Sequence, residues 1–157
     1  MSGIRSAAAW IAGPVLGAIG ALHVLWAFAP WPFEDDAALA KTVLGNKDGE
    51  LTVTPAASVG MGLVLIGAGV LTLMVYGAIR AIGPAVLRKL AICALALGLL
   101  ARGLGGFAMN SGQAEEFQDW NTALYSPLCV LLGALVTLVA LPLIRPARPE
   151  GAAPAAP

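Results

Sequence analysis

Arg102 is the residue whose type and position most directly suggest chemistry, because it interrupts an otherwise apolar stretch from residue 90 to 109. A guanidinium inside a membrane helix costs roughly 2.5 kcal/mol or more on insertion scales, so it needs water or a partner. Its long side chain could extend outward to the membrane surface. Alternatively, Ala94, Gly98 and Gly106 share its face, and small residues let another helix approach closely. We expect Arg102 to face inward.

His23 is the only histidine of the chain, and it lies at a similar estimated depth in the first apolar segment. Trp26 lies one turn further along the same face. A single histidine in an apolar segment is usually a hydrogen-bonded structural residue. Beside a carboxylate, however, it can act as an acid or a base. The sequence leaves both roles open.

The polar stretch from residue 115 to 126 supplies the remaining candidates. Asp119 and Asn121 are residue types that cap helix N-termini, so they could begin a helix at about residue 123. In a second interpretation, Glu116 or Asp119 folds over the end of the helices and pairs with Arg102. Such a pair would offset the cost of burying the arginine. The two interpretations are compatible.

Together these residues would form a polar pocket with aromatic walls in the outer half of the molecule, suited to a lipid-like, amphipathic or quinone-sized ligand. Acid–base chemistry such as isomerisation or cyclisation would use His23, Glu116 or Asp119, and whether the chain is an enzyme stays open. No metal or cofactor is expected, because one His and two Cys without CxxC spacing form no cluster. The expected ligand-binding residues are His23, Trp26, Trp31, Arg102, Glu116, Asp119, Trp120, Asn121 and Tyr125.

The elements that must position these residues follow from composition. Of the 157 residues, 59% are hydrophobic and 11% are charged, against about 25% charged in soluble domains. Charged residues are absent between positions 5 and 34, 50 and 80, and 119 and 145. Each gap can hold the roughly 20-residue helix that crosses a bilayer. We therefore expect an all-α, polytopic four-helix membrane bundle in residues 1–145, with helices at about 7–29, 55–79, 90–109 and 123–144.

The orientation follows from lysine and arginine in short loops, which favour the cytoplasmic side. If the chain crosses four times, one side carries only Lys41 and Lys47. Both termini are then cytoplasmic, because the other side carries Arg5, Arg80, Arg88, Lys89, Arg145 and Arg148. The first segment has features of a cleavable signal peptide, but its apolar run exceeds the usual stretch of about 7–15 residues. A net charge of zero gives no reason to expect a nucleic-acid partner.

The loops and the tail are distinct in composition. Residues 37–44 could form a short helix, and residues 45–49 indicate a turn. Residues 146–157 are rich in alanine and proline and are expected to be a disordered cytoplasmic tail. Cys93 and Cys129 lie at different estimated depths, so a disulfide between them is not expected.

Several motifs resemble a family of small four-helix bacterial membrane proteins known only as a domain of unknown function. They are His23-Val-Leu-Trp26, Trp31-Pro32, Lys41-Thr-Val-Leu-Gly45, Arg102-Gly103-Leu-Gly105 and the most specific one, Phe117-Gln-Asp-Trp120-Asn-Thr-Ala-Leu-Tyr125-Ser-Pro127-Leu-Cys129. The resemblance reaches to about residue 144. It implies the four-helix fold and the bacterial plasma (inner) membrane, and it supplies no activity.

Two other functions compete with a ligand site. A structural or accessory protein would bind another membrane protein, or a second copy of itself, through glycine-rich helix faces. Gly13, Gly17, Gly98 and Gly106 offer such faces, although they would serve equally well within one molecule. A transporter or channel would need a continuous polar path, and the inner halves of the four segments offer almost none.

Overall fold

The computed structural model describes residues 2–45, 52–108 and 110–144, and these residues form helices and loops without strands. Four helices are long and apolar enough to cross a membrane, as expected of a multi-pass membrane protein. They are α1 (Ser2–Leu25), α3 (Pro55–Tyr76), α4 (Ala85–Ala108) and a continuous helix from Glu115 to Ile144. The last comprises α5 (Glu115–Trp120), the π-helical turn η1 (Asn121–Tyr125) and α6 (Ser126–Ile144). The short α2 (Asp36–Leu44) lies between α1 and α3.

Local sequence explains where α2 and α3 begin and end. The Asp35 carboxylate accepts a hydrogen bond from the Ala38 N–H, and the Thr54 hydroxyl accepts one from the Ala57 N–H. Such side chains satisfy backbone donors that have no partner in the first helical turn. Gly45 and Gly77 end the two helices with positive φ angles of 73° and 95°, a conformation that glycine adopts without strain.

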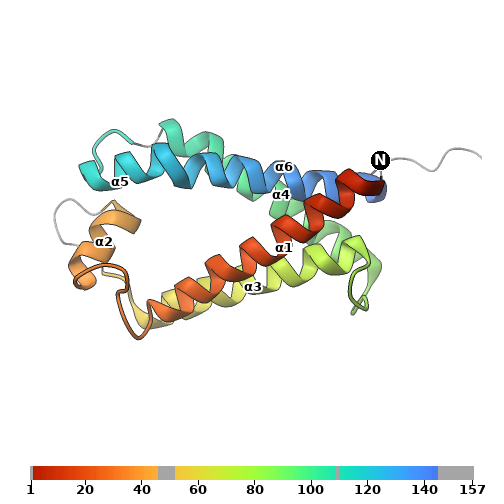
Figure 1. Ribbon diagram of the computed structural model, residues 1–157, viewed down its shortest axis with the longest axis horizontal. Helices are drawn as coiled ribbons and strands as arrows, with labels where there is room; N and C mark the ends of the chain where they lie inside the picture. The colour runs from red at the N-terminus through yellow and green to blue at the C-terminus, as the bar shows by residue number, and fades with distance from the viewer. Residues whose placement is uncertain (1, 46–51, 109, 145–157) are drawn as a thin grey trace, which may run out of the picture.

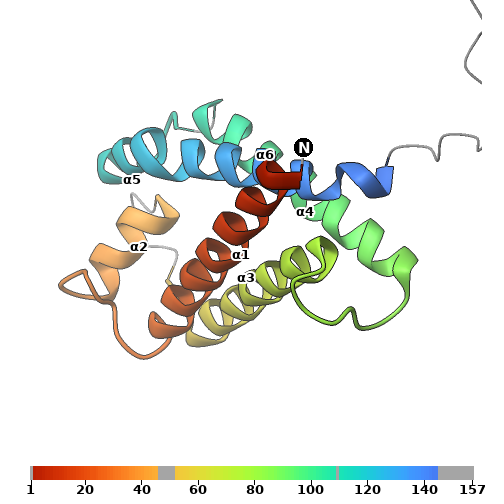
Figure 2. The ribbon, with the colours of Figure 1, turned by 45° about the vertical axis from the view of Figure 1, so that its right-hand side comes forward.

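The long helices pack in two antiparallel pairs, α1 with α3 and α4 with α6 (Figures 1 and 2). Glycines bring α1 and α3 together: a Cβ on Gly62 would lie 2.6 Å from the Gly20 carbonyl oxygen, and one on Gly69 would lie 2.5 Å from that of Gly13. The second pair is equally close at Gly103, where a Cβ would lie 2.7 Å from the Val130 nitrogen. Small residues thus set the distance within each pair.

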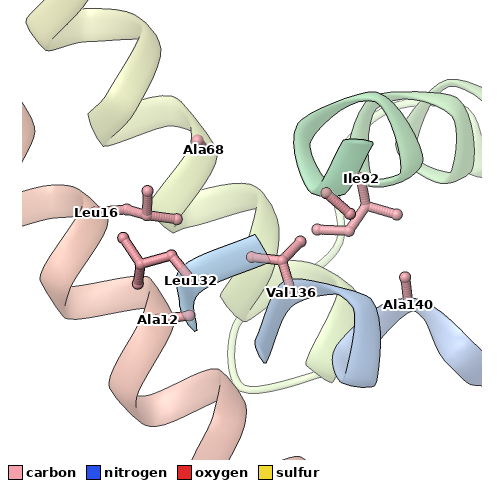
Figure 3. Packing of buried hydrophobic residues seen from close by; sticks show 8 residues of the cluster. Ala12, Leu16, Ala68, Ile92, Leu132, Val136 and Ala140 are labelled. Atoms are coloured by element: carbon pink, nitrogen blue, oxygen red, sulfur yellow. The ribbon is translucent and has the colours of Figure 1, made fainter. Parts of the chain in front are cut away.

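The two pairs meet around one apolar cluster, centred on Leu16 of α1, Ile92 of α4, and Leu132 and Val136 of α6 (Figure 3). All four side chains are at most 2% exposed. Ala12, Ala68, Ala96 and Ala140 fill the same cluster. Because α1 and α4 do not pack directly against each other in the described part of the chain, α6 and α3 carry the contacts between the pairs.

Arg5 joins three helices at the end of the molecule where the chain begins, which we call the Arg5 end. Its Nη2 donates to the Val75 carbonyl oxygen at 3.0 Å, and its Nε donates to that of Val139 at 3.3 Å. Its guanidinium also lies 5.4 Å from the centre of the Tyr76 ring. Val75 is in the last turn of α3, where carbonyl groups lack partners within the helix, so Arg5 caps α3. At the opposite end lie α2 and α5 (Figure 1), and we call this the α2 end.

The structure confirms the all-helical class, and α2 matches the short helix expected at residues 37–44. The largest difference is at residues 115–125. The expected N-terminal caps Asp119 and Asn121 lie inside a helix that already begins at Glu115, so the capping interpretation is wrong. The Asn121 side chain instead donates to the Gly106 carbonyl oxygen of α4, so it does not cap the N-terminus of the last helix. The expected turn at residues 45–49 and the expected tail at 146–157 lie outside the described residues, apart from Gly45.

Candidate functional site

Arg102 lies on α4, six residues before its last residue Ala108, or about 9 Å along the helix axis. Its Nη2 donates to the Asn121 Oδ1 at 3.1 Å, so the side chain is directed toward the neighbouring helix. Arg102 also lines a cavity of about 240 Å³ at the α2 end. Residues from four elements and a loop line this cavity: Val43 and Leu44, Arg102 and Gly106, Gln113, Phe117, and Asn121.

Asn121 connects Arg102 to the rest of the molecule. It is fully buried, and its Nδ2 donates to the Gly106 carbonyl oxygen at 2.7 Å and to the Asn110 Oδ1 at 2.6 Å. Its Oδ1 accepts from Arg102 and, at 3.0 Å, from the Ser126 hydroxyl. The amide therefore uses both of its donors and accepts two hydrogen bonds, which is its full capacity. Gly106 is in the last turn of α4, where its carbonyl needs a partner from outside the helix.

The π-helical turn explains how Asn121 reaches this position. The Ser126 N–H donates to the Asn121 carbonyl oxygen, five residues back, so the turn is wider than an α-helical turn. Pro127 follows directly. A proline inside a helix has no N–H to donate, and its ring collides with the carbonyl four residues before it. The wide turn relieves that collision, and it places Asn121 and Ser126 on the same buried face.

An ion pair holds α2 against α5 beside the cavity. Lys41 Nζ lies 2.6 Å from Glu116 Oε1, and both side chains are about half exposed. Glu116 lies in the first turn of α5. The Ala114 N–H also donates to the Gly45 carbonyl oxygen at 3.2 Å. Glu116, one of two residues expected to pair with Arg102, is thus bound to Lys41.

His23, Trp26 and Trp31 form a separate group at the end of α1. His23 Nδ1 bonds to the Ile19 carbonyl oxygen at 2.8 Å, the pattern of a side chain that donates to its own helix. Its ring centre lies 4.8 Å from that of Trp26, and the Trp26 indole N–H donates to the Trp31 carbonyl oxygen at 2.9 Å. These contacts fit the structural role that the sequence left open for His23. His23 does not line the cavity beside Arg102.

The aromatic residues near Asn121 pack on one another. The Trp120 and Tyr125 rings are stacked, with centres 6.3 Å apart and planes at 18°. Tyr125 also contacts Phe117, with ring centres 6.3 Å apart, and Phe117 lines the cavity. Asp119 is exposed on α5. Of the nine expected ligand-binding residues, only Arg102 and Asn121 therefore line the cavity together.

Sequence reasoning missed several residues of this site. Asn110 and Ser126 complete the hydrogen bonds of Asn121, and Val43, Leu44 and Gln113 line the cavity. The Lys41-Thr-Val-Leu-Gly45 motif drew attention to α2, but no pattern in the sequence places α2 next to α5.

In residues 2–45, 52–108 and 110–144, no group of three or more His, Cys, Asp or Glu side chains could hold a metal ion. Cys93 and Cys129 are free thiols.

Comparison with known proteins gives a family and no activity. Neither the curated proteins nor the solved structures include a match to this chain. A family model described as "Protein of unknown function (DUF3995)" matches residues 16–136, which include Arg102, Asn121 and all of the residues that line the cavity. This match covers most of the chain and confirms the resemblance to a domain of unknown function. The chain belongs to the DUF3995 family.

Proposed function

We propose that this protein binds the anionic head group of an amphipathic molecule, such as a carboxylate or a phosphate ester, at Arg102. The observation that carries the proposal is the partner of Arg102: among the described residues its hydrogen-bond partner is the neutral amide of Asn121. A guanidinium near an apolar environment is costly without a counter-charge. An oxyanion would supply that charge and would match the planar fork of the guanidinium.

The cavity supports a head group more than a whole lipid. Its volume of about 240 Å³ is below the roughly 300–1,000 Å³ of pockets that enclose entire small ligands. Val43, Leu44 and Phe117 give it an apolar side, where the first part of an alkyl chain would pack. The remainder of the chain would extend along the apolar helices. Since none of the lining residues is a carboxylic acid or a histidine, the proposal includes binding and no proton transfer.

The test measures binding of matched amphiphiles to the full chain in nanodiscs made of a zwitterionic lipid. Oleate and oleyl phosphate are expected to raise the Tm, and oleyl alcohol is not. At a ligand concentration 100 times Kd, the stabilisation should be about 2.7 kcal/mol. Acetate and inorganic phosphate separate an amphiphile site from a site for free anions: the proposal expects them to bind far more weakly than the amphiphiles.

Variants of arginine show whether the charge is responsible. Arg102→Gln should abolish the stabilisation by oleate, and Arg102→Lys should weaken it, because lysine keeps the charge and loses the planar fork. Arg80→Gln is the matched control, since Arg80 is exposed in the loop that connects α3 and α4. Equal binding of oleate and oleyl alcohol, or full binding by a folded Arg102→Gln protein, would contradict the proposal.

We also propose the orientation. Among the described residues, Arg5, Arg80, Arg88 and Lys89 lie near the Arg5 end or in the α3–α4 loop, and Lys41 lies at the α2 end. This bias supports cytoplasmic termini, with the cavity in the outward-facing half of a four-helix bundle. The bacterial plasma membrane is the location that the family resemblance implies.

An accessory function is the alternative. It has weaker support, because two of the four glycines that could contact a partner already contact side chains of the same chain. A Cβ on Gly13 would lie 2.8 Å from the Leu73 side chain, and Gly106 lies against Arg102 and Ser126. Gly17 and Gly98 have open space beside them. Crosslinking in native membranes would favour this function if it captured a stoichiometric protein partner.

A further inference from the structure

We propose that Asn121 is the positioning residue of this site: it directs the Arg102 guanidinium toward the cavity without neutralising its charge. The inference rests on the proposed function, because it explains how a polar network centred on the buried Asn121 leaves the exposed Arg102 cation available to an anionic ligand. Two properties of Asn121 carry it, the fixed orientation of its amide and the neutrality of that amide.

The orientation is fixed by four hydrogen bonds. Both hydrogens of Nδ2 face oxygens, those of Gly106 and Asn110, at 2.7 and 2.6 Å. Turning the amide over would bring Oδ1 against these oxygens, so Oδ1 stays on the side of Arg102. The guanidinium also lies directly against Gly106, because its Nη1 occupies the space that a Cβ on this glycine would need. One N–H of the Arg102 guanidinium therefore donates to Asn121 and orients the side chain. Asn121 does not use the other N–H groups, which can donate to a ligand.

The charge of Arg102 survives because its partner is an amide. An aspartate has nearly the same shape as asparagine, but at this position its carboxylate would form an ion pair with Arg102 and remove the net charge from the cavity. The titratable groups on the elements that pack around α4 do not compensate it. Tyr125 and Cys129 are neutral side chains at pH 7. The Glu116 carboxylate is bound to Lys41, and Glu115 is exposed. Asp119 is exposed on α5.

The experiment compares two probes with the full chain in zwitterionic nanodiscs at neutral pH. Decanesulfonate keeps its negative charge at every accessible pH, and decanol is its neutral counterpart. The measured quantity is the preference, the ratio of the two dissociation constants. Asn121→Asp should reduce the preference of the wild-type protein for decanesulfonate by about tenfold or more and leave decanol binding unchanged, since each 1.4 kcal/mol corresponds to a factor of ten. A merely structural role for Asn121 would weaken both probes equally.

Asn121→Ala provides a second measurement, because Asn121→Asp also sets a carboxylate oxygen against the Gly106 carbonyl and could fail to fold. Alanine leaves the charge of Arg102 in place but removes the hydrogen bond that orients its guanidinium. The preference for decanesulfonate should therefore fall by a smaller factor than in the aspartate variant, and the dissociation constant of decanol should again be unchanged. The inference is overturned if a folded Asn121→Asp protein keeps the wild-type preference, or if either variant loses both probes in parallel. If the wild-type protein has no preference at all, the proposed function fails first.

Discussion

At the scale of single residues, the site depends on a glycine as much as on its polar side chains. A Cβ on Gly106 would overlap the Ser126 hydroxyl oxygen and the Arg102 Nη1, and it would lie 3.3 Å from the Asn121 Oδ1. The Gly106 carbonyl oxygen also accepts from Asn121. Gly106 therefore both makes room for the guanidinium and helps to fix the amide that orients it.

Gly106→Ala should damage the site without adding or removing charge. Three polar groups would have to move, and overpacking of this kind costs about 1–3 kcal/mol. We expect a lower Tm and a weaker stabilisation by oleate. The adjacent Gly105→Ala is the matched control, because a Cβ there meets nothing within 4 Å, and alanine favours a helix over glycine by up to about 1 kcal/mol. Equal Tm values for the two variants would show that the Arg102 side chain moves aside at little cost.

At the scale of elements, the spacing of glycines determines how α1 and α3 pack. Gly13 and Gly20 on α1 meet Gly69 and Gly62 on α3, so each helix presents a glycine at the same interval of two turns. The contact at Gly20 and Gly62 is between backbones, where no side chain can rotate away. The distance between the two helices is therefore set by backbone atoms at this point.

Gly62→Ala should separate α1 from α3. The new Cβ would lie 2.6 Å from the Gly20 carbonyl oxygen, so the helices must shift apart, at a cost of about 1–3 kcal/mol. Gly60→Ala on the same helix has open space and should have the stability of the wild-type protein or slightly more. Chemical denaturation in mixed micelles would measure both. A tolerated Gly62→Ala would mean that the glycines do not set the distance between the helices.

The long helices could be predicted from the sequence, but the start of the last one could not. Apolar length alone was sufficient for the four long helices, because the hydrocarbon layer imposes it on every crossing. It did not show that residues 115–125 continue the last helix. Asp119 and Asn121 are residue types that cap helix N-termini, so local rules favoured a helix start after them. The bonds from Asn121 to Gly106 and Asn110 override those rules, and they join residues that no local pattern connects.

At the scale of the whole molecule, the two ends differ: the helix pairs pack together toward the Arg5 end, and the polar site lies at the α2 end. Leu16, Ile92 and Val136 join the two helix pairs in the apolar cluster, and Arg5 ties three helices together beyond it. His23 and Arg102 were expected at a similar depth in one pocket, which would require α1 and α4 to be neighbours. Among the described residues, however, α1 packs against α3 and α6, and α4 packs against α6 and α3. Depth could be estimated from the sequence, but the neighbour of each helix could not, since each long helix carries large apolar side chains on its exposed side as well as its buried side.

The orientation gives the whole molecule its last prediction. Two single-cysteine proteins, Ser111→Cys and Ala81→Cys, would be made in a background where Cys93 and Cys129 are replaced by alanine. Both positions are exposed, one in the loop before α5 and the other in the α3–α4 loop. If the termini are cytoplasmic, a membrane-impermeant maleimide added to intact spheroplasts should label Ser111→Cys alone, and Ala81→Cys should react only after lysis. Labelling in the opposite order would place the Arg102 cavity in the cytoplasmic half, where its ligand would have to come from the inner leaflet or the cytoplasm.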